Sequence, residues 1–276
     1  MSAAASVPGS IGQPALTASG TRLRNVARSE WTKLWSVRST RWALLATVLA
    51  TVGFSVLYAA TTVAGWDRRS PGARASFDPT SSSLGGLYFG QLAIAAVGAL
   101  VIASEYSTGG IRVTFVAVPQ RVTVLTAKAA VVAVVGLLTG TLSSFAAFAA
   151  GQAFFATKGA AAHLGDPGVL RAVAGGGLYV AACGLLGYAV GTLLRHSAAA
   201  LTTAAGLLFV LPLLTNLLPG TWGHTVREYF FANAGVQITT VHPTSGLAPW
   251  TGYGIFTLEW LAIMAVGVAL IRRHDA

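Results

Sequence analysis

Charge is scarce in this sequence. Of its 276 residues only 9% are charged, whereas 54% are apolar. Soluble globular domains carry about 25% charged residues, so this chain lacks the polar surface that would keep it in water. The composition excludes an ordinary soluble domain and predicts an integral membrane protein.

Cysteine is nearly absent, and the common catalytic motifs are missing. The single cysteine, Cys183, lies inside an apolar run, so we expect a buried thiol and no intramolecular disulfide. No Gly-Lys-Ser or Gly-Lys-Thr follows a glycine-rich loop, which excludes a Walker A nucleotide site. Gly-x-Ser-x-Gly, His-Glu-x-x-His and cysteine–histidine clusters are absent too. We therefore expect no enzyme active site, metal or cofactor on this chain.

Long apolar runs are what the sequence does have. About 20 consecutive apolar residues span a bilayer as a helix, and six such segments predict an all-α, polytopic fold. The first 21 residues are small, polar and uncharged, and they lack the regions of a signal peptide. We expect 1–21 to be a disordered tail and 22–276 to form one transmembrane domain. The expected spans are 42–64, 84–103, 122–157, 172–194, 198–218 and 250–271.

The positive charges indicate an orientation. Six spans put both termini on one side, and with the N-terminus inside, twelve of the 18 Lys and Arg residues fall in inner segments. The positive-inside rule then predicts cytoplasmic termini in the plasma membrane. The net charge of +10 is thus explained by topology and gives no reason to expect a nucleic-acid partner.

Two connections differ in kind. Spans four and five are joined by "RHS", Arg195 to Ser197, which predicts an antiparallel helical hairpin. The loop after span five has about thirty residues and is rich in aromatic side chains, which favour headgroup depth. We expect short helices there, lying as a lid on the outer face of the membrane.

The stretch "RLRNVARSEWTKLWSVRSTRW", Arg22 to Trp42, repeats apolar residues at helical spacing between basic ones. This pattern is typical of an amphipathic helix lying on an anionic inner leaflet. Such a helix either anchors the topology or acts as a lever that moves the first span.

The stretch "SEYSTGGIRVTFVAVPQR" begins at Ser104, between spans two and three. Its Gly109–Gly110 pair predicts the end of the second span. A short helix through Ile111–Val118 would end at Pro119, because proline disfavours helix at the preceding residue. The segment has the shape of a cytoplasmic docking helix, with Glu105 at the membrane edge as either a functional or a simply solvated carboxylate.

Two polar residues lie within spans. Glu259 costs about 2.5–3.5 kcal/mol to insert, so it should face the bundle interior, a partner or a cavity. It is either protonated and hydrogen-bonded or involved in substrate handling or coupling, and Gln91 is a second candidate for the pathway. Small residues such as Gly187 and Gly191 predict close helix contacts.

Four stretches in order resemble the permease subunit of type-2 ABC exporters. They are "SEWTKLWSVRSTRW", "SEYSTGGIRVTFVAVPQRVTVLTAK", "REYFFANAG" followed by "LAPWTGY", and "LIRRHDA". The resemblance covers Arg22 to Ala276. It implies six helices per subunit, two permease subunits per transporter, and two copies of a separate cytoplasmic ATPase that bind ATP and magnesium. We expect the two permease subunits to be identical.

The resemblance also implies residue roles. The coupling element that docks on the ATPase corresponds to Glu105, Thr108, Gly109, Ile111, Arg112, Phe115 and Pro119. The connecting helix, within Arg24–Arg41, corresponds to Arg28, Glu30, Trp31, Lys33, Leu34 and Arg38. Glu259 departs from the family pattern, where a small or apolar residue is expected.

These observations predict an exporter permease for an apolar or amphipathic substrate. Two other functions are compatible with the sequence. One is an ATP-independent, proton-coupled carrier that uses Glu259, and the other is a non-transporting membrane scaffold.

Overall fold

The computed structural model describes residues 18–107, 109–110, 121–243 and 246–273, except for the side chains of 18–23, 121 and 271–273. Throughout this part of the chain every regular element is a helix and none is a strand. The expected all-α fold class is therefore confirmed.

Six helical segments are long and apolar enough to cross a membrane. They are α2 (Arg38–Ala64), α5 (Leu87–Ser107), α7 (Arg121–Ala156), α8 (Val169–Leu194), the continuous run α9 (Ser197–Ala205), η2 (Gly206–Val210) and α10 (Leu211–Thr215), and α13 (Pro249–Arg273). The chain is thus a multi-pass membrane protein. Helix α7, at about 1.5 Å per residue, is about 54 Å long and exceeds the hydrocarbon thickness of about 30 Å.

The amphipathic helix α1 (Ala18–Ser36) precedes the first span. It begins at Ala18, so residues 18–21 belong to this helix and not to a tail. It ends before Val37, whose extended backbone separates it from α2. Arg38, expected on the connecting helix, therefore opens the first span instead.

Two boundaries of the second span also differ from the expected 84–103. The helix starts after a turn through Gly85 and Gly86, where an added Cβ at Gly86 would strike the Thr51 carbonyl. It continues four residues past the expected end, because nothing before the Thr108–Gly110 segment interrupts the apolar helix. Glu105 consequently lies on α5 itself.

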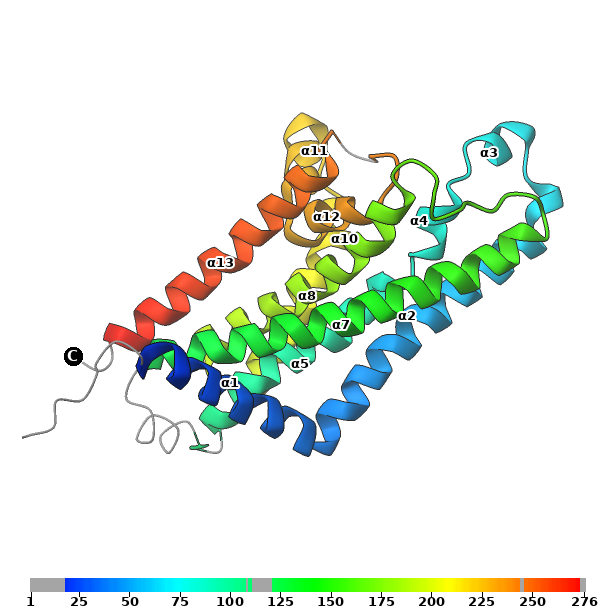
Figure 1. Cartoon of the computed structure of the whole chain (residues 1–276). Helices are drawn as coiled ribbons and strands as arrows, with labels where there is room; N and C mark the ends of the chain where they lie inside the picture. Colours follow the sequence, from blue (N-terminus) through cyan, green and yellow to red (C-terminus); the bar gives the residue numbers. More distant parts are fainter. Residues whose placement is uncertain (1–17, 108, 111–120, 244–245, 274–276) are drawn as a thin grey trace, which may run out of the picture.

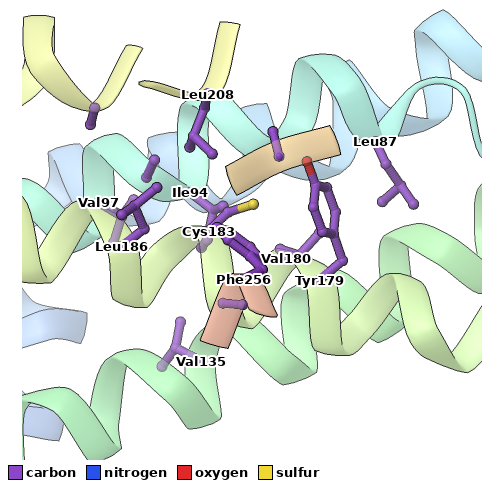
Figure 2. Close-up of a cluster of buried hydrophobic side chains, with 14 of the residues drawn as sticks. Leu87, Ile94, Val97, Val135, Tyr179, Val180, Cys183, Leu186, Leu208 and Phe256 are labelled. Atoms are coloured by element: carbon purple, nitrogen blue, oxygen red, sulfur yellow. The ribbon is translucent and has the colours of Figure 1, made fainter. Parts of the chain in front are cut away.

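Helix α8 is the most buried of the six spans, and α5, α7 and α13 pack around it. Glycines make the contact between α5 and α8 close: a Cβ on Gly187 would lie 2.0 Å from Ala95 O, and one on Gly191 would lie 2.7 Å from Ala99 O. Cys183 lies in the core beside these glycines, fully buried as expected (Figure 2). The prediction of close helix contacts is confirmed.

The short helices gather at one end of the bundle. Figure 1 shows α3 (Pro71–Ala75) and α11 (Gly220–Tyr229) at the end opposite α1. The remaining ones are η1 (Trp66–Arg68), α4 (Pro79–Ser83), α12 (Phe231–Gly235) and η3 (Val236–Thr239). Helices α11, α12 and η3 are the short helices expected after span five.

The other end of the bundle carries α1. Figure 1 shows α1 lying across the ends of α5 and α7, on the same side as the C-terminal end of α13. The tight connection between α8 and α9 also lies here: Arg195 adopts φ 56°, and the His196 side chain caps α9 by accepting from Ala199 N. The two helices form the predicted antiparallel pair.

Candidate functional site

Helix α1 presents one face to the bundle. Glu30 and Leu34 are buried and Trp31 is half-buried, whereas Arg28 and Arg38 are exposed. Trp31 packs against the core that includes Leu34. A carboxylate at the centre of an otherwise apolar contact face needs a partner, because burying an unpaired charge is costly.

That partner is Lys128 of α7. Its Nζ donates to Glu30 Oε2 at 2.5 Å and to Glu105 Oε1 at 2.7 Å. Lys33 completes the group, with its Nζ 2.9 Å from Glu30 Oε1 and 3.5 Å from Glu105 Oε1. We refer to Glu30, Lys33, Glu105 and Lys128 as the ion-pair cluster.

The ion-pair cluster is buried to an unusual degree. The side chains of Lys128, Glu30 and Glu105 are 1%, 6% and 18% exposed, and Lys33, at 48%, is the most exposed of the four. Two positive and two negative groups face one another, so the cluster is balanced in charge. Balance of this kind is what allows ions to be removed from water.

The pKa of Lys33 reflects this neighbourhood. Burial by itself lowers the pKa of its ammonium, but the hydrogen bonds and charges of Glu30 and Glu105 outweigh that effect and raise the pKa above its ordinary value. Because a raised pKa keeps the charged form at neutral pH, Lys33 remains a cation in the cluster.

The cluster joins three elements that are far apart in sequence. It links α1 to α5 and α7, and Lys128 and Glu30 are 98 residues apart. Glu105 lies just before the segment that separates α5 from α7, and Lys128 lies early in α7, the helix that follows this segment. The cluster therefore ties α1 to the two helices, α5 and α7, that flank this segment.

Of the predicted coupling element, only Glu105 and Gly109 are among the described residues. Thr108, Ile111, Arg112, Phe115 and Pro119 lie outside the described residues, so the short coupling helix stays a prediction. Gly109 is described and has φ 73°, a left-handed conformation that favours glycine. This is the helix-terminating turn expected after the second span.

The sequence predicted Glu30, Lys33 and Glu105 as site residues, but it did not predict Lys128. Lys128 was considered only as one of the inner positive charges that determine topology. Its position among apolar residues in "LTAKAAVV" was the available signal, because a lysine inside an apolar helical run needs a counter-ion.

Gln91 lies at the centre of the bundle and is fully buried. Its Nε2 donates to Leu208 O at 3.1 Å, and its Oε1 accepts from the Tyr179 hydroxyl. The side chain thus connects α5 to α8 and to the π-helical segment η2 (Gly206–Val210). Both the nitrogen and the oxygen of the Gln91 amide are therefore hydrogen-bonded within the core.

Pro212 explains why Leu208 needs this donor. Proline has no N–H, so the carbonyl four residues before it loses its helical hydrogen bond. Leu208 is that residue, and Gln91 supplies the missing donor. Tyr88 of α5 similarly donates its hydroxyl to Phe209 O at 3.5 Å. Helix α5 thus supplies side-chain hydrogen-bond donors to two backbone carbonyls of the π-helical segment.

We expect Gln91→Leu to lower the free energy of unfolding by about 2 kcal/mol, because it leaves the Leu208 carbonyl and Tyr179 hydroxyl unpaired in the core. Adding Pro212→Ala should restore part of the loss, since the substituted alanine supplies a backbone N–H to Leu208 O. Unfolding in detergent titrated with sodium dodecyl sulfate measures both effects. If Pro212→Ala restores none of the stability lost in Gln91→Leu, this explanation is wrong.

Glu259 lies half-buried on α13, close to the backbone N–H of Phe231 at the start of α12. Its Oε2 is buried without a hydrogen-bond partner among the described residues, as is Nε1 of the neighbouring Trp260. Glu259 and Gln91 therefore lie in different surroundings, one against the short helices after span five and one in the core.

Two further findings bear on function. Within the described ranges, no group of three or more His, Cys, Asp or Glu side chains could hold a metal ion. No model of a known protein family and no curated protein matches the chain.

Proposed function

We propose that this chain is the membrane-spanning permease subunit of an ATP-driven ABC exporter. Six membrane-crossing helices supply a transport scaffold, and the sequence contains no Walker A motif. The energy would then come from a separate ATPase subunit that holds ATP and magnesium. The sequence resemblance described above supports this division of labour.

The observation that carries the proposal is the ion-pair cluster. The proposed docking segment, 105–119, begins with Glu105, whose carboxylate accepts from Lys128 on the helix that follows the segment. Lys128 also binds Glu30 on α1. A force applied by an ATPase to the segment would thus reach α1, α5 and α7 together, rather than bending one loop.

The mechanism follows from these contacts. Two copies of the chain would form the pore, with two ATPase subunits beneath them at the cytoplasmic end. ATP binding would close the ATPase pair and displace the docking segment and α1, which shifts the spans between inward-open and outward-open states. A pathway with few charges suits an apolar or amphipathic substrate.

The orientation in this proposal has both termini in the cytoplasm and the protein in the plasma membrane. It is supported by the excess of Lys and Arg in the predicted inner segments. The common location of α1 and the end of α13 at one end of the bundle (Figure 1) agrees with it.

The test is capture and stimulation of the ATPase encoded beside the gene for this chain. After co-expression, the tagged chain should retain the ATPase and raise its rate of ATP hydrolysis in liposomes. Phe115→Asp should abolish both, because a charge replaces an apolar docking side chain. The matched control is Leu164→Asp, the same kind of change at an exposed residue in the loop between α7 and α8. This variant should still retain and stimulate the ATPase.

Failure of the wild-type chain to bind or stimulate that ATPase would refute the proposal. Equal behaviour of the two variants would refute the assignment of the docking segment. A non-transporting scaffold would retain its cellular role when Phe115→Asp is introduced.

The second candidate is a proton-coupled carrier, favoured by the half-buried Glu259 and its unpartnered oxygen. A pH gradient across liposomes that contain only this chain would then drive substrate uptake without ATP. Glu259→Gln should abolish that uptake, whereas an exporter that depends on an ATPase would show no gradient-driven transport in either form.

A further inference from the structure

The exposed charges on α1 and the first turn of α2 are all positive. Between residues 24 and 41 the exposed charged side chains are Arg24, Arg28, Lys33, Arg38 and Arg41. Glu30 is the one acidic residue of this stretch, and its buried carboxylate binds Lys33 and Lys128. Because the ion-pair cluster occupies that carboxylate, it does not neutralise the arginines outside the cluster.

Two of these arginines lie on one exposed face of α2. In the part of the chain that the structure describes, neither the Arg38 nor the Arg41 guanidinium has a hydrogen-bond or ion-pair partner. Trp42, Leu45 and Leu49 follow at helical spacing and are all exposed. At 3.6 residues per turn, the five residues lie within about 100° around the helix. We refer to these five residues as the arginine–leucine face.

The arginine–leucine face changes in character along the helix. The two leucines lie deepest in the span, Trp42 follows, and the two arginines lie at the start of α2. From Leu49 to Arg38 the helix rises about 17 Å, which is close to the thickness of one leaflet, about 20 Å. Aliphatic side chains contact acyl chains, tryptophan favours headgroup depth, and arginine binds phosphate. The order of residues therefore matches a phospholipid from its chains to its phosphate.

Helix α1 continues this pattern beside α2. Arg24, Arg28 and Trp35 are exposed and lie on one side of α1, because they are four and seven residues apart. Trp31 lies on the same side, and its ring centroid is 5.9 Å from that of Trp35. Figure 1 shows α1 running into the start of α2 at one corner of the bundle. Cations and tryptophans from two helices thus meet near this corner.

We propose that the arginine–leucine face binds an anionic phospholipid, with its phosphate at Arg38 and Arg41 and its acyl chains along Leu45 and Leu49. Phosphatidylglycerol has the required chemistry, because no ammonium of its own balances the charge of its phosphate. Phosphatidylcholine carries both charges, so arginines without a carboxylate partner gain less from binding it. The inference rests on exposed residues alone. It depends neither on an ATPase partner nor on which side of the membrane the termini occupy.

The test uses the full chain in liposomes made of equal parts of phosphatidylglycerol and phosphatidylcholine. The protein is extracted in mild detergent, and the lipids that stay bound to it are quantified by mass spectrometry. We expect bound phosphatidylglycerol to exceed phosphatidylcholine at least about five-fold, the factor that one basic residue near a membrane surface contributes for anionic lipid. Both leaflets have the same composition, so the result does not depend on the orientation of the protein.

Paired substitutions locate the site. Arg38→Gln combined with Arg41→Gln should remove the excess of phosphatidylglycerol, and the variant should fold because neither guanidinium has a partner among the described residues. Arg38→Lys combined with Arg41→Lys keeps both charges and should keep most of the excess. The matched control is Arg68→Gln combined with Arg69→Gln, which removes two arginines just beyond the other end of α2. This control should leave the excess unchanged.

Equal retention of the two lipids by the wild-type chain would overturn the proposal, as would an excess that survives Arg38→Gln with Arg41→Gln. An equal loss in the control at Arg68 and Arg69 would reduce the effect to net charge and also overturn it.

The other candidate occupant of this face is a second copy of the chain. Leu49→Cys tests for it, because the only native cysteine, Cys183, is fully buried and a bifunctional maleimide would react at the substituted position. We expect the chain to stay uncross-linked there. Efficient cross-linking into dimers would show that a second copy covers the face, and the lipid site would be wrong.

Discussion

Lys128→Met should lower the free energy of unfolding by about 3–5 kcal/mol, the range for removing one partner of a buried ion pair. The Lys128 side chain is 1% exposed, and its ammonium binds two carboxylates. Methionine keeps the length of the side chain but leaves Glu30 and Glu105 with only the partly exposed Lys33. The measurement is unfolding in detergent titrated with sodium dodecyl sulfate.

The chain provides a matched control in Lys158. Its Nζ lies 2.8 Å from Asp67 Oδ2, and that pair joins residues 91 apart, but the Asp67 side chain is 79% exposed. Exposed pairs contribute about 0–1 kcal/mol, so Lys158→Met should change stability little. The two variants remove the same charge, but Lys128 is buried between two carboxylates and Lys158 binds one exposed carboxylate.

A double variant separates pairing from simple loss of packing. Glu30→Gln combined with Lys128→Met should cost less than the two single variants added together, because each single change strands a charge that the double change removes. Strict additivity would show that Glu30 and Lys128 do not interact in the membrane. Equal losses for Lys128→Met and Lys158→Met would show that the cluster is not buried.

Gly98→Ala should destabilise the bundle by about 3 kcal/mol, at the upper end of the cost of overpacking. A Cβ on Gly98 would lie 1.9 Å from Gly184 O and 3.0 Å from Tyr188 N, both backbone atoms of α8. Backbone atoms cannot rotate away as a flexible side chain can. The α5–α8 contact would have to open along its length.

Gly254→Ala is the control for this prediction. Gly254 also lies within a long helix, α13, but nothing lies within 4 Å of an added Cβ. Alanine favours helix over glycine by about 0.5–1 kcal/mol, so this variant should be neutral or slightly more stable. If both variants behave alike in the same detergent titration, the close α5–α8 contact is absent from the folded protein.

The sequence by itself determined the membrane character, the helical class and the number of spans. Hydropathy and helical periodicity depend on neighbours along the chain, so a run such as Val169–Leu194 is recognisable without knowledge of its surroundings. Local chemistry also predicted the turn at Gly109 and the amphipathic helix before the first span.

Only the tertiary structure decided what the polar residues do. Lys128 pairs with Glu30 across 98 residues, and Gln91 reaches Leu208 across 117. Such contacts depend on which helices pack against one another and in what register, and hydropathy and periodicity along the chain do not determine either.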